Sequence, residues 1–208
     1  MQAVLKFIHG GGFMMYPLIL TSIVLITVIL ERAISLRRSV LDGDNLLDQI
    51  REATGNNPDA NKDVSIALCE ETKRPLGRIF ARGLRNASRN PDAIEMALEQ
   101  EASNELPNLE SNLIIIKTIV NISPLLGLLG TIAGMIRSFQ AASEQGLSNP
   151  TQILGGISEA LISTATGITL AVIGFIFFNY FSNLVRKMTE DIEYYGSELV
   201  NYLTGRIE

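Results

Sequence analysis

Three long apolar segments interrupt an otherwise mixed pattern of hydrophobic and polar residues. The first runs without a charged residue from Phe13 to Leu30, the second from Thr118 to Ile136, and the third from Ala160 to Val185. About 20 residues of α-helix cross a hydrocarbon layer about 30 Å thick, so each segment is long enough to span a membrane. Helices in soluble cores are usually shorter and carry more charges. The pattern therefore predicts an all-α integral membrane protein with three transmembrane helices.

A cleavable secretory signal is the alternative for the first segment, because it lies near the N-terminus behind a single Lys6. Three features favour a retained helix instead. The apolar run is longer than a usual signal core, it ends in LERAISLRR rather than in small residues, and two further spans follow.

Lysine and arginine are distributed unevenly among the connections. Twelve of the seventeen lie from Arg32 to Lys117 and three follow the third segment, whereas the link from Gln140 to Ser158 contains none. Cationic loops stay in the cytoplasm, so we expect the N-terminus outside and the C-terminus inside. The predicted order is an outer N-terminal segment at 1–12, transmembrane helix 1 at 13–31, a cytoplasmic helical loop at 32–117, transmembrane helix 2 at 118–139, an outer link at 140–158, transmembrane helix 3 at 159–185 and a cytoplasmic tail helix at 186–208.

The predicted cytoplasmic loop carries few chemical signals. Its acidic and basic residues are mixed, and the net charge of -5 predicts no nucleic-acid partner. The single Cys69 has no internal disulfide partner, and we expect a reduced thiol. Breakers between Leu41 and Arg89 predict short helices. A longer helix is expected to start after Asn90 and to be kinked by Pro107, just before the second span.

Small and weakly polar residues share one face of the second span. At 100° per residue they fall within about a third of the circumference, and leucines and isoleucines cover the other side. One interpretation is close helix packing, since Gly130 and Gly134 form a GxxxG pair. The set comprises Ser123, Gly127, Gly130, Thr131, Gly134 and Ser138, and Pro124 lies beside it.

The third span repeats this pattern. Glu159, Ser163, Thr166, Gly167 and Gly174 cluster on one side, with Thr164 at the margin of the same arc. Two such faces suggest a shared, partly hydrated interior, although hydroxyls of this kind also bond back to their own helix. An acid at the edge of a span is a functional candidate by default; the alternative for Glu159 is a solvated boundary residue.

The residue types that the spans lack limit the chemistry that this chain can perform. No Asp, Glu or His lies in the middle of any span, so a protonatable group in the membrane has to come from another chain. No nucleophile and base pair, metal-ligand cluster or phosphate loop appears, and we expect neither enzymatic activity nor a cofactor.

The sequence resembles the MotA, TolQ and ExbB family of proton-channel subunits, and it is most similar to ExbB or TolQ. The resemblance rests on several motifs across all three spans and both ends of the long loop. They are MYPLIL and LERAISLRR, then LPNLESNL, SPLLGLLGTIAGMIRSF from Ser123 to Phe139, and GGISEALISTATGITLAVIGFIFFNYF from Gly155 to Phe181.

The resemblance implies a homopentamer in the bacterial inner membrane, surrounding an ExbD-like or TolR-like single-span partner that supplies an aspartate. It implies that Thr131 and Thr164 line the proton path, with Glu159 near the periplasmic entrance. The motor would then use the proton motive force to energise TonB-type or TolA-type work at the outer membrane, such as import of iron-siderophores or other nutrients.

Several alternatives stay open. Thr164 and Thr166 are separated by about 200° in projection, so only one points at a narrow pore, and the choice of Thr164 rests on the motif. A MotA-like stator is disfavoured, because that branch has four spans. Three further alternatives remain open: a TolQ-type role in envelope maintenance during cell division, transport of Na⁺ instead of H⁺, and a passive membrane scaffold.

Overall fold

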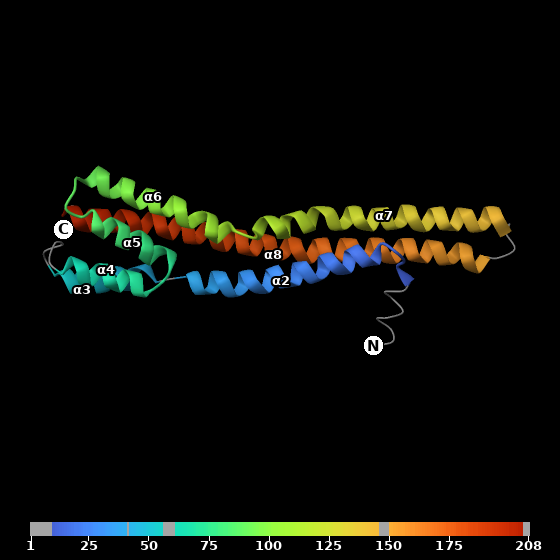
Figure 1. Ribbon diagram of the computed structural model, residues 1–208, viewed down its shortest axis with the longest axis horizontal. Helices are drawn as coiled ribbons and strands as arrows, with labels where there is room; N and C mark the ends of the chain where they lie inside the picture. The colour runs from blue at the N-terminus through green and yellow to red at the C-terminus, as the bar shows by residue number, and fades with distance from the viewer. Residues whose placement is uncertain (1–9, 41, 56–60, 146–149, 206–208) are drawn as a thin grey trace. The chain divides into compact units, whose positions relative to one another are not determined.

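The computed structural model describes residues 10–40, 42–55, 61–145 and 150–205 (Figure 1). The predicted outer segments at 1–12 and 140–158 and the tail at 186–208 each extend beyond these ranges. Within them the regular structure is α-helical throughout. The helices are α2 (Met15–Ser39), α3 (Gly43–Thr54), α4 (Lys62–Glu71), α5 (Pro75–Arg85), α6 (Pro91–Glu110), α7 (Leu113–Gln145) and α8 (Pro150–Thr204).

Three helical stretches, which start at Met15, Pro91 and Pro150, are long and apolar enough to cross a membrane. The predicted all-α membrane protein is therefore confirmed at this level. The chain divides into two compact units. Unit 1 contains the described residues up to Arg32 together with Asn112–Tyr180, and unit 2 contains Ala33–Ser111 and the described residues from Phe181 onward.

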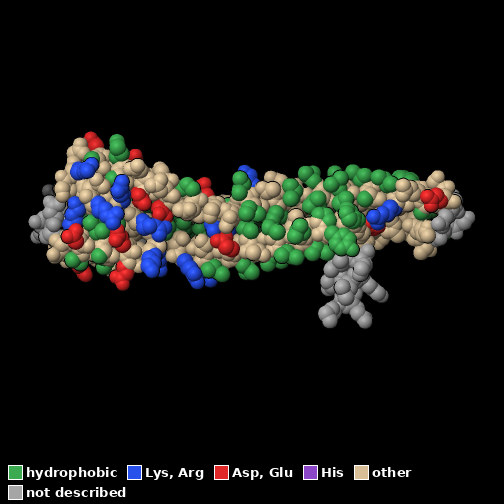
Figure 2. All heavy atoms as spheres, in the orientation of Figure 1, with side chains coloured by type: hydrophobic (Ala, Val, Ile, Leu, Met, Phe, Trp, Pro, Cys, Tyr) green, Lys and Arg blue, Asp and Glu red, His purple; other side chains and the backbone are tan. Residues whose placement is uncertain are grey.

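Unit 1 is built on an antiparallel pair formed by α7 and the first part of α8 (Figure 1). Gly174 packs against Val120 and Gly156 packs against Gly134, so the two helices run in opposite directions. The visible face of this unit is covered mainly by hydrophobic side chains (Figure 2). Exposed positions on α7 are the leucines and isoleucines expected on the apolar side of the span, among them Leu125, Leu128, Leu129, Ile132 and Ile136. This apolar surface suits a lipid or protein environment.

Helix α6 contains Pro107, the residue at which the sequence predicts a kink, and continues to Glu110. The break comes at Ser111 and Asn112, where Asn112 has a φ of 62°. Pro107 deprives the Ser103 carbonyl of its helical donor, and Ser103 is exposed.

Unit 2 confirms the expectation of short helices between Leu41 and Arg89. Asp42 and Asn90 cap α3 and α6 by accepting bonds from the amides of Asn45 and Ala93. The core residues come from all helices of the unit, including Leu46, Ile50, Ile79, Phe80, Leu84, Ile94, Leu98 and Leu199. Charged side chains gather on its visible surface (Figure 2).

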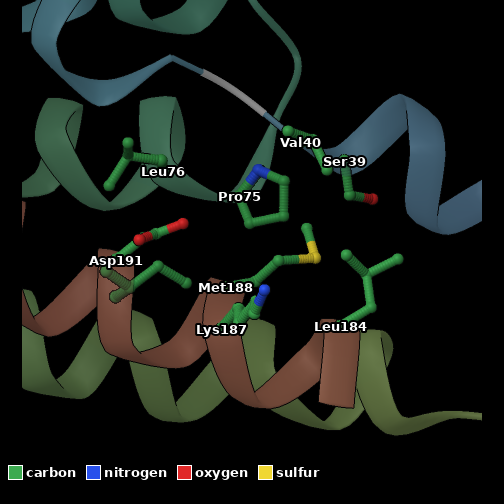
Figure 3. Close-up of a pocket in the computed structure, with 9 residues that line it drawn as sticks. Ser39, Val40, Pro75, Leu76, Leu184, Lys187, Met188 and Asp191 are labelled. Atoms are coloured by element: carbon green, nitrogen blue, oxygen red, sulfur yellow. The ribbon is translucent and has the colours of Figure 1, made fainter. Parts of the chain in front are cut away.

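A small cavity of about 140 Å³ lies in unit 2 between the start of α5 and α8 (Figure 3). Pro75, Leu76, Leu184 and Met188 give it a mainly apolar lining. Its charged lining residues, Lys187 and Asp191, belong to α8.

Candidate functional site

The small residues of α7 form its contact with α8. A Cβ atom on Gly127 would lie 3.0 Å from the Cα atom of Thr164, and one on Gly134 would lie 2.5 Å from the Gly156 carbonyl oxygen. Because these neighbours are backbone atoms, larger side chains would force the helices apart. Gly130 against Ser163, and Gly167 against Ser123, are packed equally closely.

The serines of the same face are buried and hydrogen bonded. The Ser123 hydroxyl donates to the Ile119 carbonyl at 2.7 Å, and the Ser163 hydroxyl donates to the Ala160 carbonyl at 3.0 Å. The Ser138 hydroxyl lies 3.1 Å from the Gly134 carbonyl and 2.9 Å from the Ile153 carbonyl. These hydroxyls therefore complete the helix contact and do not face an open channel within the single chain.

The two candidate threonines meet at one peptide group. The Thr164 hydroxyl donates to the Gly127 carbonyl on α7 at 2.9 Å. In an α-helix the same carbonyl accepts a bond from the amide four residues later, which here belongs to Thr131. The Thr131 hydroxyl, which is half-exposed, donates to the Leu128 carbonyl at 2.7 Å. Since each hydroxyl has given its hydrogen to a carbonyl, its oxygen remains available as an acceptor.

Thr166 behaves differently from Thr164. Its hydroxyl donates to the Ile162 carbonyl of its own helix at 2.8 Å, and Thr169 does the same with Ala165. Of these three threonines of α8, Thr164 is the one whose hydroxyl bonds to α7. Pro124 lies within α7, half-buried, and removes one helical donor without ending the helix.

Glu159 has a cationic partner that the sequence analysis did not identify. Nη1 of Arg137 donates to both carboxylate oxygens of Glu159 at 2.6 Å. The Glu159 side chain is 15% exposed and that of Arg137 is 50% exposed. Gly12, at a φ of 65°, lies so close to the carboxylate that a Cβ atom would overlap it. The acid is therefore shielded on one side and neutralised on the other.

The sequence contains a signal that could have identified Arg137 as the cationic partner of Glu159. Arg137 ends the second span just as Glu159 begins the third, and a shielded acid in a membrane protein requires a partner. Among the described residues, no group of His, Cys, Asp or Glu is arranged to hold a metal ion.

Comparison of the sequence with known proteins identifies one family. A model described as the MotA/TolQ/ExbB proton channel family matches residues 71–194. The chain is 33% identical over 201 residues to putative biopolymer transport protein ExbB-like 3 of Synechocystis sp., covering 96% of this chain and 90% of that protein.

Two further relatives match shorter regions. The Tol-Pal system protein TolQ of Haemophilus influenzae is 30% identical over 138 residues, covering 61% of this chain and 59% of TolQ. The biopolymer transport protein ExbB of Aquifex aeolicus is 37% identical over 84 residues, covering 40% of this chain and 55% of that ExbB. The family match and the near full-length relative establish that the chain belongs to the MotA/TolQ/ExbB proton channel family.

Proposed function

We propose that this chain is the proton-channel subunit of an inner-membrane motor of the ExbB or TolQ type. Five copies surround an ExbD-like or TolR-like single-span partner, and proton flow through the assembly energises a TonB-like or TolA-like protein. The family match and the ExbB and TolQ relatives support this proposal. Nutrient import and envelope maintenance during cell division are its two candidate outputs.

The proposed topology places the N-terminus in the periplasm and the C-terminus in the cytoplasm. The concentration of Lys and Arg between the first two spans supports it. The length of α8 agrees with a cytoplasmic extension. At about 1.5 Å per residue, its 55 residues reach about 82 Å, whereas the hydrocarbon layer is about 30 Å thick.

The proposed proton step uses Thr131 and Thr164 as hydrogen-bond acceptors. Their hydroxyl hydrogens are bound to the Leu128 and Gly127 carbonyls, so their oxygens accept a bond from a protonated acid but donate none to a carboxylate. A partner aspartate beside them is therefore favoured in its neutral form. It holds its proton through the apolar zone and releases it where water stabilises the carboxylate.

Glu159 and Arg137 form the proposed periplasmic entrance. The pair carries no net charge, and Arg137 fixes the direction of the carboxylate. In the proposed step, a water molecule at the entrance that carries an excess proton transfers it to the Glu159 carboxylate. Glu159 then releases this proton to the next water toward the threonines and regains its pairing with Arg137, so no unpaired carboxylate is left in the membrane.

A passive scaffold is the second candidate, because the contact between α7 and α8 uses the small residues for packing. The two candidates differ at the hydroxyls. A scaffold needs the glycines, whereas the motor also needs the oxygens of Thr131 and Thr164.

Proton uptake by reconstituted vesicles tests the proposal. The full chain is purified with an ExbD-like or TolR-like single-span partner, and uptake is measured under an imposed gradient, with a parallel sodium measurement. We expect Thr131→Ala and Thr164→Ala to abolish uptake in an intact assembly, while Thr169→Ala, which loses only a bond within its own helix, retains it. An intact wild-type assembly that takes up neither protons nor sodium overturns the proposal. Uptake of sodium without protons would identify sodium as the coupled ion instead.

A further inference from the structure

One surface of unit 2 is an arginine ridge, formed by Arg78, Arg82 and Arg85 on α5. Their spacing of four and three residues places them on one face, and all three are exposed. They line a hollow of about 360 Å³ together with Lys73, Ala81, Glu70 and Glu101.

Two of the three arginines of this ridge form ion pairs within the chain. Arg78 pairs with Glu105, and Arg85 pairs with Glu70. Among the described residues, Arg82 and Lys73 have no carboxylate within ion-pair distance. Arg82 of the ridge and Lys73 beside it in the hollow therefore remain available to an acidic partner.

A second surface of unit 2 has the opposite character. A groove of about 300 Å³ lies between α6 and α8, and no Lys or Arg lines it. Its apolar lining includes Ile79, Leu98, Ile192 and Val200, all buried. The acidic groove is bordered by three exposed carboxylates that have no cationic partner among the described residues, namely Glu95, Glu99 and Glu193.

The ridge and the groove lie on different sides of α6. Glu101 lines the hollow of the ridge and Glu99 lines the groove. Two residues of helix separate their side chains by about 200°. A copy of the chain therefore cannot place its own ridge in its own groove.

We infer that the arginine ridge of one copy docks in the acidic groove of a second copy. Charge complementarity supports this occupant, because unpaired cations of one surface meet unpaired carboxylates of the other. Arginine also suits the floor of the groove, since its aliphatic stem covers apolar surface while the guanidinium reaches the rim. Ridge against ridge, or groove against groove, juxtaposes like charges and is disfavoured.

The contact joins two different surfaces and is therefore heterologous. Repetition of a heterologous contact generates a ring when the rotation closes. The inference therefore identifies one interface of the proposed pentamer. To that extent it rests on the proposed function. The contacts are exposed ion pairs, so salt weakens them.

Disulfide cross-linking between differently tagged copies tests the contact. The full chain carries Cys69→Ala as background; one copy then carries Arg82→Cys and the other Glu99→Cys, expressed together in membranes. We expect dimers that contain both tags. The control pair combines Arg82→Cys with Glu52→Cys, an exposed acid of α3 outside the groove. Equal yields from both pairs overturn the inference.

Charge reversal provides the second test, with Lys73→Cys and Glu95→Cys reporting the same contact. Arg82→Glu alone and Glu99→Arg alone are each expected to reduce the cross-linked dimer about tenfold, because repulsion replaces attraction. The two changes together restore it. If the double variant stays as low as the single ones, the ridge does not occupy the groove.

These measurements need neither the single-span partner nor a proton gradient. If the selective cross-link forms but no protons are taken up, the contact is supported and the proposed motor function is excluded. If protons are taken up but the cross-link is not selective, the motor function is supported and the contact is excluded.

Discussion

The hydroxyl of Thr164 donates a hydrogen bond to the backbone carbonyl of Gly127, 2.9 Å away on the neighbouring helix. Hydrogen bonds between membrane helices contribute about 0.6 kcal/mol on average and at most about 1.7 kcal/mol. Loss of this bond is therefore expected to change stability little, whatever it does to transport.

Thr164→Ser and Thr164→Val separate the two effects. Serine keeps the hydroxyl, so we expect near-normal proton uptake. Valine keeps the shape but has no hydroxyl oxygen, so uptake should fall to background while the thermal unfolding midpoint of the purified assembly stays close to wild type. If Thr164→Val unfolds the assembly, the hydroxyl has a packing role. If the Thr164→Val assembly takes up protons normally, the hydroxyl has no role in transport.

Gly134 tests the requirement for close packing. A methyl group there would lie 2.5 Å from the Gly156 carbonyl oxygen and 2.9 Å from the Ala160 amide nitrogen. We expect Gly134→Ala to destabilise the protein by about 1 to 3 kcal/mol, as overpacking does. Denaturant unfolding of the purified protein measures the change.

Gly155 provides the matched control for this prediction. It lies in the same helical pair, but nothing lies within 4 Å of a Cβ atom placed on it. Gly155→Ala should be neutral or should stabilise α8 by up to about 1 kcal/mol through helix propensity. Equal losses from both variants would contradict the packing account.

Sequence periodicity predicted the small face of α7 but not its neighbour. A 3.6-residue period tells which residues share a side, so the positions of Gly127, Gly130 and Gly134 followed directly. Which helix they contact depends on tertiary packing, and the structure shows that α8 of the same chain occupies this face.

The candidate site shows the same limit. Thr164 lies at the margin of its arc in projection, and only the position of Gly127 shows why its hydroxyl is directed toward α7. The pairing of Arg137 with Glu159 joins residues 22 positions apart and depends on the antiparallel register, which periodicity does not provide. The break at Asn112 was also missed. Asn is enriched in the left-handed region, but few residues of any type other than glycine adopt it, so the residue type alone does not locate a break.

The ion pair between Arg137 and Glu159 should show energetic coupling. Removal of Arg137 leaves a shielded carboxylate without its partner, at an expected cost of about 1 to 3 kcal/mol. The double variant Arg137→Ala with Glu159→Ala removes both charges and should be less destabilised than the sum of the single variants. Additive losses, measured by chemical unfolding, would show that the two side chains act independently.

Cys69 should be unreactive in the folded protein. Burial raises the pKa of its thiol to about 12, with a smaller contribution from the neighbouring Glu70 carboxylate. The thiolate is the nucleophile, so a thiol reagent at pH 8 should label native protein much more slowly than denatured protein. A Glu52→Cys control, at an exposed position of α3, should react quickly in both states.

The same shift has a consequence for stability. An unfolded cysteine loses its proton near pH 8.5, whereas the folded thiol holds it until about pH 12. Between these values the folded state binds more protons, so stability falls as pH rises. Cys69→Ala should weaken this decline in a denaturation series above pH 8.5; an unchanged slope would assign it to other groups.

Glu105 should anchor α6 to α5. Its side chain is 9% exposed and accepts a hydrogen bond from Nε of Arg78 at 2.5 Å, while Arg78 is 42% exposed. This bond is also the main reason that the pKa of Arg78 is raised. Glu105→Ala leaves an arginine that water can still solvate, so we expect a loss of about 1 to 2 kcal/mol rather than the larger cost of a fully buried unpaired charge. Faster amide exchange in α5 and α6 measures the loss. Glu110→Ala, at an exposed position of the same helix with no cationic partner among the described residues, should leave the exchange unchanged; similar acceleration in both variants would mean that α6 is held by its apolar face alone.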